Sequence, residues 1–295
     1  MRLGDERESD NIEDRRGMPV GGGVVTGGIG TVLLVLAGLY FGVDPSVILN
    51  AIQGGGGTQQ QAAPSRPHTG EPSGGQHDAA RHFVAQVLAD TEDTWTAVFR
   101  QHNRTYTVPR LVLYSGATQS ACGRAQAAVG PFYCPNDRRV YLDLAFFEDL
   151  QRKFGAPGQF AQAYVVAHEI GHHVQNLLGT LERVNAQRQQ VSQLESNQLS
   201  VRLELQADCY AGVWANQANR TRQILEQGDI EQAMTAAAAV GDDRLQQRAR
   251  GYSVPESFTH GTSAQRVGWF KRGLETGDVQ ACDTFRRRPR TAAQQ

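Results

Sequence analysis

Two histidines and a glutamate near the middle of the chain have the spacing needed to bind and use a metal ion. Residues 168–172 read His-Glu-Ile-Gly-His. On an α-helix, His168 and His172 lie one turn apart on the same face, so two neutral imidazoles can bind one divalent cation. Glu169 lies about 100° around the helix, where a carboxylate can take a proton from a water that the cation activates. The pattern therefore predicts a catalytic zinc site with Glu169 as the general base.

The surrounding sequence predicts the helix that carries these residues. Between positions 163 and 179 the apolar residues recur every three or four positions, and Gly179 ends the run. The alternative interpretation is a metal-free histidine pair packed near the core. We favour the metal site because two unpaired imidazoles and a carboxylate would be costly to bury in so apolar a helix. His173 points away from the pair and is predicted to support the site or to face solvent, not to be a ligand.

A catalytic zinc ion usually has three protein ligands and one position for water, so a third ligand must lie elsewhere in the chain. Residues 204–208 read Glu-Leu-Gln-Ala-Asp, which places Glu204 and Asp208 on one helix face. We expect Glu204 to complete the ligand set, and Asp208 to accept the outer N–H of one zinc-binding histidine. The small Ala207 would let this helix approach the first one closely, whereas Cys209 turns away from the Glu204 face. The alternative is an exposed acidic face of an amphipathic helix.

A turn nearer the C-terminus carries two further candidates. Residues 258–266 read Phe-Thr-His-Gly-Thr-Ser-Ala-Gln-Arg. In this turn, which leads into a helix, His260 and Arg266 could reach the site and stabilise an oxyanion. A single histidine in a loop is also typical of a solvated residue, so the residues alone leave both interpretations open.

The composition indicates one globular domain with appendages. The chain has 295 residues and a net charge of −1, which gives no indication of a nucleic-acid partner. Its four cysteines can form two disulfides in an oxidising compartment, with three possible pairings. The sequence favours Cys122 with Cys134, which closes a short turn-rich loop, and Cys209 with Cys282, which ties the C-terminal region to a central helix. In a cytoplasmic domain, four buried free thiols would be the better interpretation.

The first quarter of the chain predicts a membrane anchor. Residues 1–20 are polar and of mixed charge, and we expect a disordered cytoplasmic tail there. Residues 23–43 carry no charge over a length that can cross a hydrocarbon layer of about 30 Å, so a transmembrane helix is expected at 21–45. A cleaved signal peptide is the competing interpretation, but the tail before the run is long and acidic and no clear cleavage site ends the run.

Charge around the uncharged run predicts its orientation. Arginines precede the run and the next cation is Arg66, so the positive-inside bias places the N-terminus in the cytoplasm and the domain in the periplasm or outside the cell. Gly-x-x-x-Gly patterns at 23–27 and 38–42 could pair such helices in an oligomer. Residues 46–77 are predicted to be a flexible linker, and residues 288–295 a disordered C-terminal tail.

Residues 78–287 are predicted to form one α+β, zincin-like domain that is mainly helical with a small β-sheet. Helical spacing of apolar residues is found at 79–99, 145–154, 199–214 and 230–240, and strands are expected at 111–114 and 139–143. The strand at 139–143 precedes the metal helix. Its free edge could pair with an extended peptide, although a fully paired strand would have the same sequence pattern.

As an ordered set, these motifs resemble those of the bacterial putative neutral zinc metallopeptidase family (YpfJ-type). The likeness runs from about residue 120 to 285 and includes Gly-Pro-Phe-Tyr-Cys-Pro, Val-Tyr-Leu-Asp and the motifs described above. It implies a glutamate-type zincin with zinc on His168, His172 and Glu204. The Glu-x-x-x-Asp helix and the Thr-His-Gly turn are more distantly similar to elements of HtpX-type membrane peptidases, which implies that His260 and Arg266 lie at the active site.

The sequence therefore predicts a membrane-anchored, gluzincin-like zinc endopeptidase with one Zn²⁺ ion and a peptide or protein substrate. The alternative is a membrane-tethered zinc-binding interaction or assembly protein without significant proteolysis. A structural zinc site is usually closed by four protein ligands, whereas this sequence offers three. A zinc hydrolase acting on non-peptide amides is a third interpretation.

Overall fold

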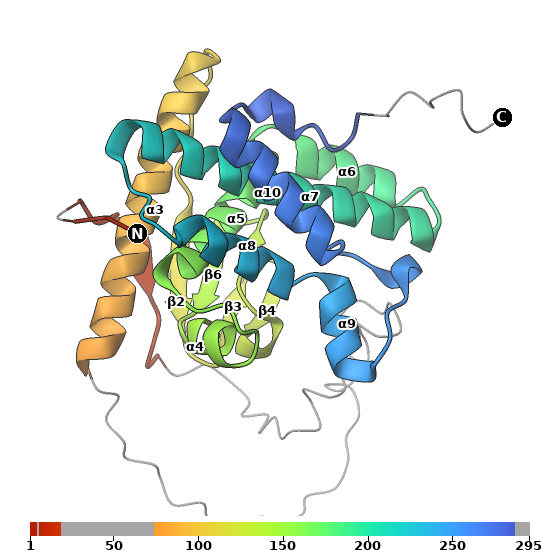
Figure 1. Cartoon of the computed structure of the whole chain (residues 1–295), viewed down its shortest axis with the longest axis horizontal. Helices are drawn as coiled ribbons and strands as arrows, with labels where there is room; N and C mark the ends of the chain where they lie inside the picture. Colours follow the sequence, from red (N-terminus) through yellow and green to blue (C-terminus); the bar gives the residue numbers. More distant parts are fainter. Residues whose placement is uncertain (5, 19–73, 287–295) are drawn as a thin grey trace, which may run out of the picture.

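The computed structural model of the protein describes residues 1–4, 6–18 and 74–286 (Figure 1). The described residues are mainly helical and include two small β-sheets, which confirms the predicted α+β class. Helix α5 (Gln159–Leu177) contains the His-Glu-x-x-His pattern and packs against α3, α7 and α8. The elements around α5 therefore determine what its histidines meet.

The larger sheet mixes parallel and antiparallel pairing. Its strand order is β1-β2-β6-β5, with the bounds Ile12–Asp14, Arg110–Tyr114, Arg139–Asp143 and Phe132–Cys134. The β1–β2 and β2–β6 pairs are parallel and β5–β6 is antiparallel. The prediction that the strand at 139–143 has a free edge is wrong over residues 139–141, where β5 pairs on the side opposite β2. Residues 132–134 lie in turn-rich sequence, so their pairing gave no periodic signal.

A second sheet and short helical turns complete the connections. The hairpin β3–β4 joins Ala117–Ser120 to Gly123–Gln126. The 3₁₀ turns η1, η2 and η3 span Ala127–Val129, Pro255–Ser257 and Val279–Cys282.

Helices α3, α4, α7 and α8 correspond to the segments predicted at 79–99, 145–154, 199–214 and 230–240, and α3 and α7 extend beyond them. Helices α3, α4 and α6 span Gly74–Gln101, Ala145–Arg152 and Thr180–Arg188. Helices α7, α8, α9 and α10 span Gln193–Arg222, Asp229–Ala239, Asp242–Arg250 and Ser263–Thr276. The start of α7 has a capping box, in which Ser192 and Glu195 exchange side-chain and backbone hydrogen bonds.

Large aromatic side chains fix α5 between α7 and α10. The ring of Phe160 stacks on Trp214 of α7 with centroids 5.8 Å apart. Tyr164 meets Phe270 of α10 edge to face at 5.5 Å. All four rings are fully buried or nearly so. These contacts orient the helix that carries the histidines without any contribution from a bound ligand.

The predicted disordered tail at residues 1–20 is wrong for the described part of that segment. Residues 12–14 form β1, and the side chains of Leu3 and Ser9 are buried against the domain. The segment has few apolar residues because much of its docking is polar: Ser9 and Asn11 both donate to the Glu92 carboxylate of α3. Hydrophobic periodicity cannot reveal such an attachment.

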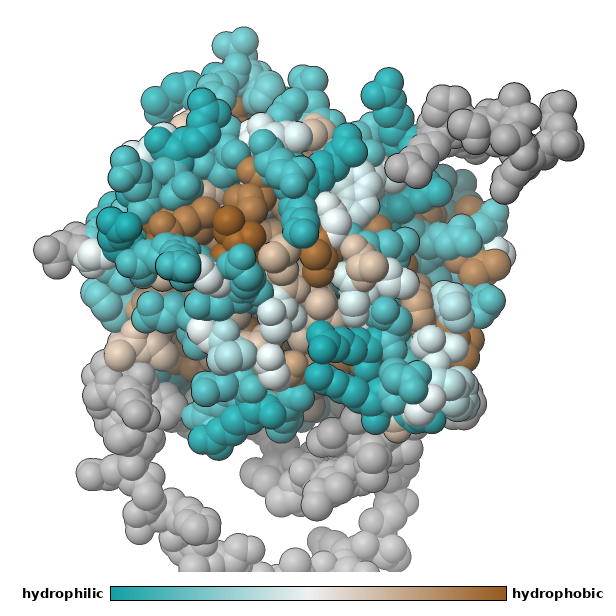
Figure 2. Space-filling view, viewed as in Figure 1, coloured by the Kyte–Doolittle hydropathy of each residue, from teal (hydrophilic) through white to brown (hydrophobic). Residues whose placement is uncertain are grey.

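Several predicted segments lie wholly or largely outside the described residues. These are the transmembrane helix at 21–45, most of the linker at 46–77 and the C-terminal tail at 288–295. Residues 74–77 are described and begin α3, so the linker prediction is wrong there. Within the described part of the chain, no helix combines the length and hydropathy needed to cross a membrane. The face shown in Figure 2 is largely hydrophilic, with small hydrophobic areas between polar side chains.

Both favoured cysteine pairs are joined by disulfides. The Cys122–Cys134 bond ties the turn of the β3–β4 hairpin to β5, and Cys209–Cys282 ties α7 to η3. The loops that they close have sequence separations of 12 and 73 residues. In the chain-entropy model such loops stabilise the fold by about 3 and about 4.5 kcal/mol.

Helices α7 and α10 touch backbone to backbone at two glycines. A Cβ added to Gly273 would lie 1.9 Å from the carbonyl oxygen of Cys209, and one added to Gly212 would lie 2.1 Å from the carbonyl oxygen of Phe270. Neither position can hold a side chain without moving a helix. Gly268, on the same helix α10, has no atom within 4 Å of an added Cβ.

We expect Gly273→Ala to lower the free energy of unfolding by about 1–3 kcal/mol, because the methyl group forces α10 away from α7. The matched change Gly268→Ala should raise stability by up to about 1 kcal/mol through helix propensity. Urea denaturation followed by circular dichroism measures both. Equal stability of the two variants would show that the helices do not cross as described.

Candidate metal centre

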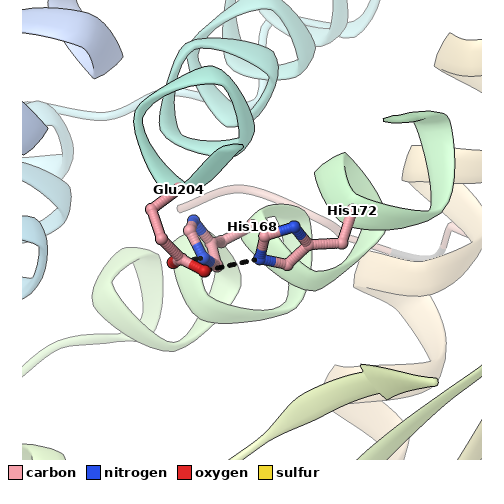
Figure 3. A group of neighbouring side chains, drawn as sticks. All are labelled: His168, His172 and Glu204. Atoms are coloured by element: carbon pink, nitrogen blue, oxygen red, sulfur yellow. Dashed lines mark hydrogen bonds and ion pairs between the residues drawn. The ribbon is translucent and has the colours of Figure 1, made fainter. Parts of the chain in front are cut away.

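Three side chains from two helices meet at the predicted metal site (Figure 3). His168 and His172 come from α5 and Glu204 comes from α7. Nε2 of His168 is 3.2 Å from Oε2 of Glu204, and Nε2 of His172 is 3.4 Å from Oε1. One donor atom from each residue lies within 4.8 Å of the others. The fold thus gathers the three expected ligands, which are 36 positions apart at their extremes, into one cluster.

The outer nitrogen of each imidazole is held by another side chain. Nδ1 of His168 donates to Oδ1 of Asp208 at 2.9 Å, and Nδ1 of His172 donates to Oε1 of Gln175 at 2.9 Å. Both Nε2 lone pairs are therefore directed into the cluster. The role of Asp208 was expected from the sequence. Gln175 was missed, although its position three residues after His172 on the same helix was the available signal.

Glu204 reaches the histidines because α5 and α7 are in close contact beside them. A Cβ added to Gly171 would lie 2.9 Å from the carbonyl oxygen of Ala207 and 3.0 Å from its Cα. A larger residue at position 171 would separate the helices and withdraw Glu204. The small Ala207 was expected to permit this approach, whereas Gly171, inside the His-Glu-x-x-His pattern, was overlooked.

The carboxylates make the cluster strongly attractive to positive charge. Burial lowers the pKa of His168, but Asp208 and Glu204 outweigh it and raise that pKa to about 10. Burial likewise opposes ionisation of Glu204, yet the imidazoles of His172 and His168 hold its pKa well below the usual range. The site therefore favours a positive charge, and a divalent cation would satisfy the same groups.

Glu169 lies one position after His168 and is only 7% exposed. Burial raises the pKa of its carboxyl group, and the two imidazoles partly oppose that effect. A raised pKa makes the carboxylate a better proton acceptor near neutral pH. Its environment thus suits the predicted general base.

Arg266 lies beside His168, against both Asp208 and the cluster, with Nη2 3.5 Å from Nε2 of His168 and 4.0 Å from Oε2 of Glu204. Its side chain is 3% exposed, with Nε donating to Oδ2 of Asp208 at 2.8 Å and Nη2 to Oδ1 at 2.9 Å. The hydroxyl of Tyr164 also donates to Asp208. Burial raises the pKa of Asp208, but Arg266 and His168 lower it to about 2. These contacts fix Asp208, and through it His168, while the expected contact of Arg266 with an oxyanion stays a prediction.

His260 is half-exposed, and a carboxylate that sequence reasoning missed holds the loop around it. Oδ2 of Asp242 accepts the backbone N–H groups of Thr259, His260 and Gly261 at 2.8, 2.6 and 3.0 Å. Oδ1 of the same residue lies 3.2 Å from Nδ1 of His260. Although burial lowers the pKa of His260, the hydrogen bond to Asp242 and the charge of Glu204 raise it. His260 is therefore within electrostatic reach of the metal cluster.

His173 supports the site from inside the core. Its Nε2 donates to the carbonyl oxygen of Thr107 at 2.6 Å, and its Nδ1 accepts from the hydroxyl of Tyr133 at 2.9 Å. Burial lowers its pKa to about 4, so the ring is neutral at physiological pH. His173 thereby joins α5 to β5 and to the segment before β2. The prediction of a supporting residue fits, and the solvent-facing alternative does not.

The donor set fits a zinc ion. Two imidazole nitrogens and one carboxylate are typical ligands of catalytic zinc, and the rings are already held in the tautomer that zinc requires. Cys209 is close in sequence, but its sulfur is bonded to Cys282. The described residues that form this cluster thus number three.

A His-Glu-x-x-His helix crossed by a second helix that presents a glutamate defines the zincin class of zinc metallopeptidases. The family model described as "Putative neutral zinc metallopeptidase" matches residues 1–285, and the chain belongs to this family.

Relatives from distant bacteria cover most of the chain. This chain is 48% identical to "Uncharacterized protein YpfJ" of Escherichia coli (strain K12). The 294 aligned residues cover 97% of this chain and 99% of the relative. The chain is 45% identical over 261 residues, 84% of each chain, to "Uncharacterized protein Mb2605" of Mycobacterium bovis and to "Uncharacterized protein Rv2575" of Mycobacterium tuberculosis. No solved structure matches the chain.

We expect the purified protein to bind one zinc ion per chain and Asp208→Asn to weaken that binding about 10- to 100-fold, because the neutral amide removes the charge that strengthens His168 as a ligand and that Arg266 pairs with. Competition with a chromophoric chelator at fixed pH measures the affinity. The exposed residue Asp10 provides the control, since Asp10→Asn should leave zinc affinity unchanged. A folded Asp208→Asn variant with unaltered affinity would contradict this role.

Proposed function

We propose that the protein is a zinc-dependent metallopeptidase that hydrolyses peptide bonds in peptide or protein substrates. The observation that carries the proposal is the cluster of His168, His172 and Glu204, with both histidines oriented from behind and with Glu169 close enough to interact electrostatically with both. Three protein ligands are typical of catalytic zinc, which keeps a further position for water or substrate, whereas structural zinc is usually held by four.

Each residue around the cluster has a distinct task in this reaction. When bound, zinc supplies a Lewis acid that lowers the pKa of a water toward about 7 and polarises the scissile carbonyl group. Glu169 accepts a proton from the attacking water and passes it to the leaving amine. Asp208 and Gln175 keep the two imidazoles in the ligating tautomer. Arg266 balances the buried charge of Asp208, so its task is positioning.

His260 is proposed to stabilise the oxyanion that develops on the scissile carbonyl. Its half-exposed ring lies within reach of Glu204, and a hydrogen bond to Asp242 leaves its Nε2 as the free end of the ring. A donor of this kind is most effective when it is held in place before the substrate arrives. Asp242 provides that restraint through the loop backbone as well as through the ring.

The location proposed for the enzyme is a membrane facing an oxidising compartment. The uncharged run at 23–43 has the length of a membrane anchor, and two disulfides are typical of proteins outside the cytoplasm. A domain tethered in this way could cleave extended segments of proteins, which supports endopeptidase activity. We also propose that the runs of two chains pair through the Gly-x-x-x-Gly patterns at 23–27 and 38–42.

We expect Glu169→Gln to retain zinc and to lose about 10²- to 10⁴-fold in hydrolysis, because the amide cannot accept the proton of the attacking water. Casein cleavage and zinc content are measured on the same preparation. The control is Glu182→Gln, an exposed glutamate of α6, which should behave like the unaltered protein. Full casein cleavage by zinc-loaded Glu169→Gln protein would exclude Glu169 as the base, and absence of cleavage by the unaltered zinc-loaded protein would favour a zinc-binding assembly protein instead.

We expect His260→Ala to lower kcat about 10²- to 10³-fold and Asp242→Asn to lower it about 10-fold or more, because each weakens the same oxyanion donor. If Asp242 acts through His260, the double variant should be no slower than His260→Ala alone. Losses that multiply in the double variant would assign Asp242 a role that does not depend on His260.

A further inference from the structure

The N-terminal segment, residues 6–18, is an integral part of the larger sheet. In β1, Ile12 is paired with Leu111 and Asp14 with Leu113 in parallel register. The backbone N–H of Arg15 donates to the carbonyl oxygen of Leu113 at 2.8 Å, which continues the ladder beyond the strand. In Figure 1 the segment runs beside α3, at the edge of the body.

A carboxylate of α3 is directed at this segment. Glu92 is only 4% exposed and accepts hydrogen bonds from Ser9 Oγ at 2.6 Å, Asn11 Nδ2 at 2.9 Å and Arg7 Nη2 at 3.0 Å. The N–H of Ser9 also donates to the carbonyl oxygen of Ala85 at 3.0 Å. A buried carboxylate is stable only with such partners, so the segment supplies the hydrogen-bond donors that Glu92 of α3 requires.

Charges on the two surfaces are complementary. Glu8 lies 2.7 Å from Nδ1 of His82 and 3.3 Å from a guanidinium nitrogen of Arg81, both on α3. Glu13 lies 3.4 Å from the guanidinium of Arg139, at the start of β6. The acidic residues of the segment thus face basic residues of the domain, and the family model that matches the chain also includes this segment.

This arrangement restricts how the chain can meet a membrane. The uncharged run at 23–43 lies between β1 and α3 in the sequence. A chain that crosses a bilayer once between two strands places them on opposite sides, so those strands cannot share a sheet.

We propose that residues 6–18 and the metal-binding domain lie in the same compartment, on one side of any membrane that the protein meets. The surface formed by α3 and the outer edge of β2 takes the N-terminal segment of its own chain as its partner. This topology departs from the one that the arginines before the run predict. It does not depend on zinc or on peptidase activity.

Labelling with a membrane-impermeant maleimide tests the proposal on the full chain in its native membrane. The variants Asp10→Cys and Glu182→Cys place one thiol on the N-terminal segment and one on α6, at exposed positions. The unaltered protein, whose four cysteines are paired, is the unlabelled control. We expect both thiols to react to the same extent in intact spheroplasts, or both to react only after permeabilisation. Labelling of one and protection of the other, by about tenfold or more, would overturn the proposal.

A second measurement tests the docking itself. We expect Glu92→Ala to lower the thermal midpoint of the detergent-solubilised full chain by about 2–6 °C, because three donors of the segment lose their acceptor. Glu182→Ala, at an exposed position, serves as the control and should cause no shift. Equal midpoints for both variants would show that the segment is not part of the folded body.

Discussion

The site depends on the hydrogen bonds and charge pairs that the buried Asp208 carboxylate makes. Its carboxylate is fully buried and accepts hydrogen bonds from His168 and Tyr164 of α5 and from Arg266 of α10. Two helices, α5 and α10, are therefore tied to one pair of oxygen atoms on α7. A buried carboxylate is stable only when such partners are present, so the need to satisfy it also fixes the orientation of a metal-binding ring.

Close backbone contacts make this arrangement geometrically possible. Gly171 lets α5 approach α7 at Ala207, and Gly212 and Gly273 do the same for α7 and α10. Hydrogen bonds of about 3 Å between side chains on different helices require such short separations. The glycines carry no chemistry themselves, yet they determine whether Glu204 and Arg266 can reach the same histidine.

Asp242 supports the site as well, from a different part of the fold than Asp208. It ties the start of α9 to the loop of residues 259–261, and so holds His260 at the edge of the cluster. The site is thus fixed from two directions, by a charge pair in the core and by a loop clamp nearer the surface. This division leaves one side of the site buried around Asp208 and the other side half-exposed at His260.

The chemistry of the site could be predicted from sequence because it depends on local spacing. The residues at 168–172 share a helix, and so do those at 204–208, so their relative directions follow from helix geometry alone. The bounds of β6 were also predicted correctly as Arg139–Asp143, because the signal for a strand is likewise local in the sequence. The two cysteine pairs could also be favoured from the sequence, because the length of each closed loop and its turn residues follow directly from the order of residues.

Only the tertiary structure could decide what depends on contacts between distant segments. The burial of Arg266 beside His168, the clamp by Asp242 and the pairing of both edges of β6 involve residues far apart in the sequence. The N-terminal segment gives the plainest case: its composition is that of a disordered tail, because polar side chains carry no periodic signal. By itself the sequence determined which residues can bind zinc and on which helices they lie. The packing of α5 against α7, α9 and α10 decided which groups hold them, because a buried polar side chain needs a partner and distant segments supply it.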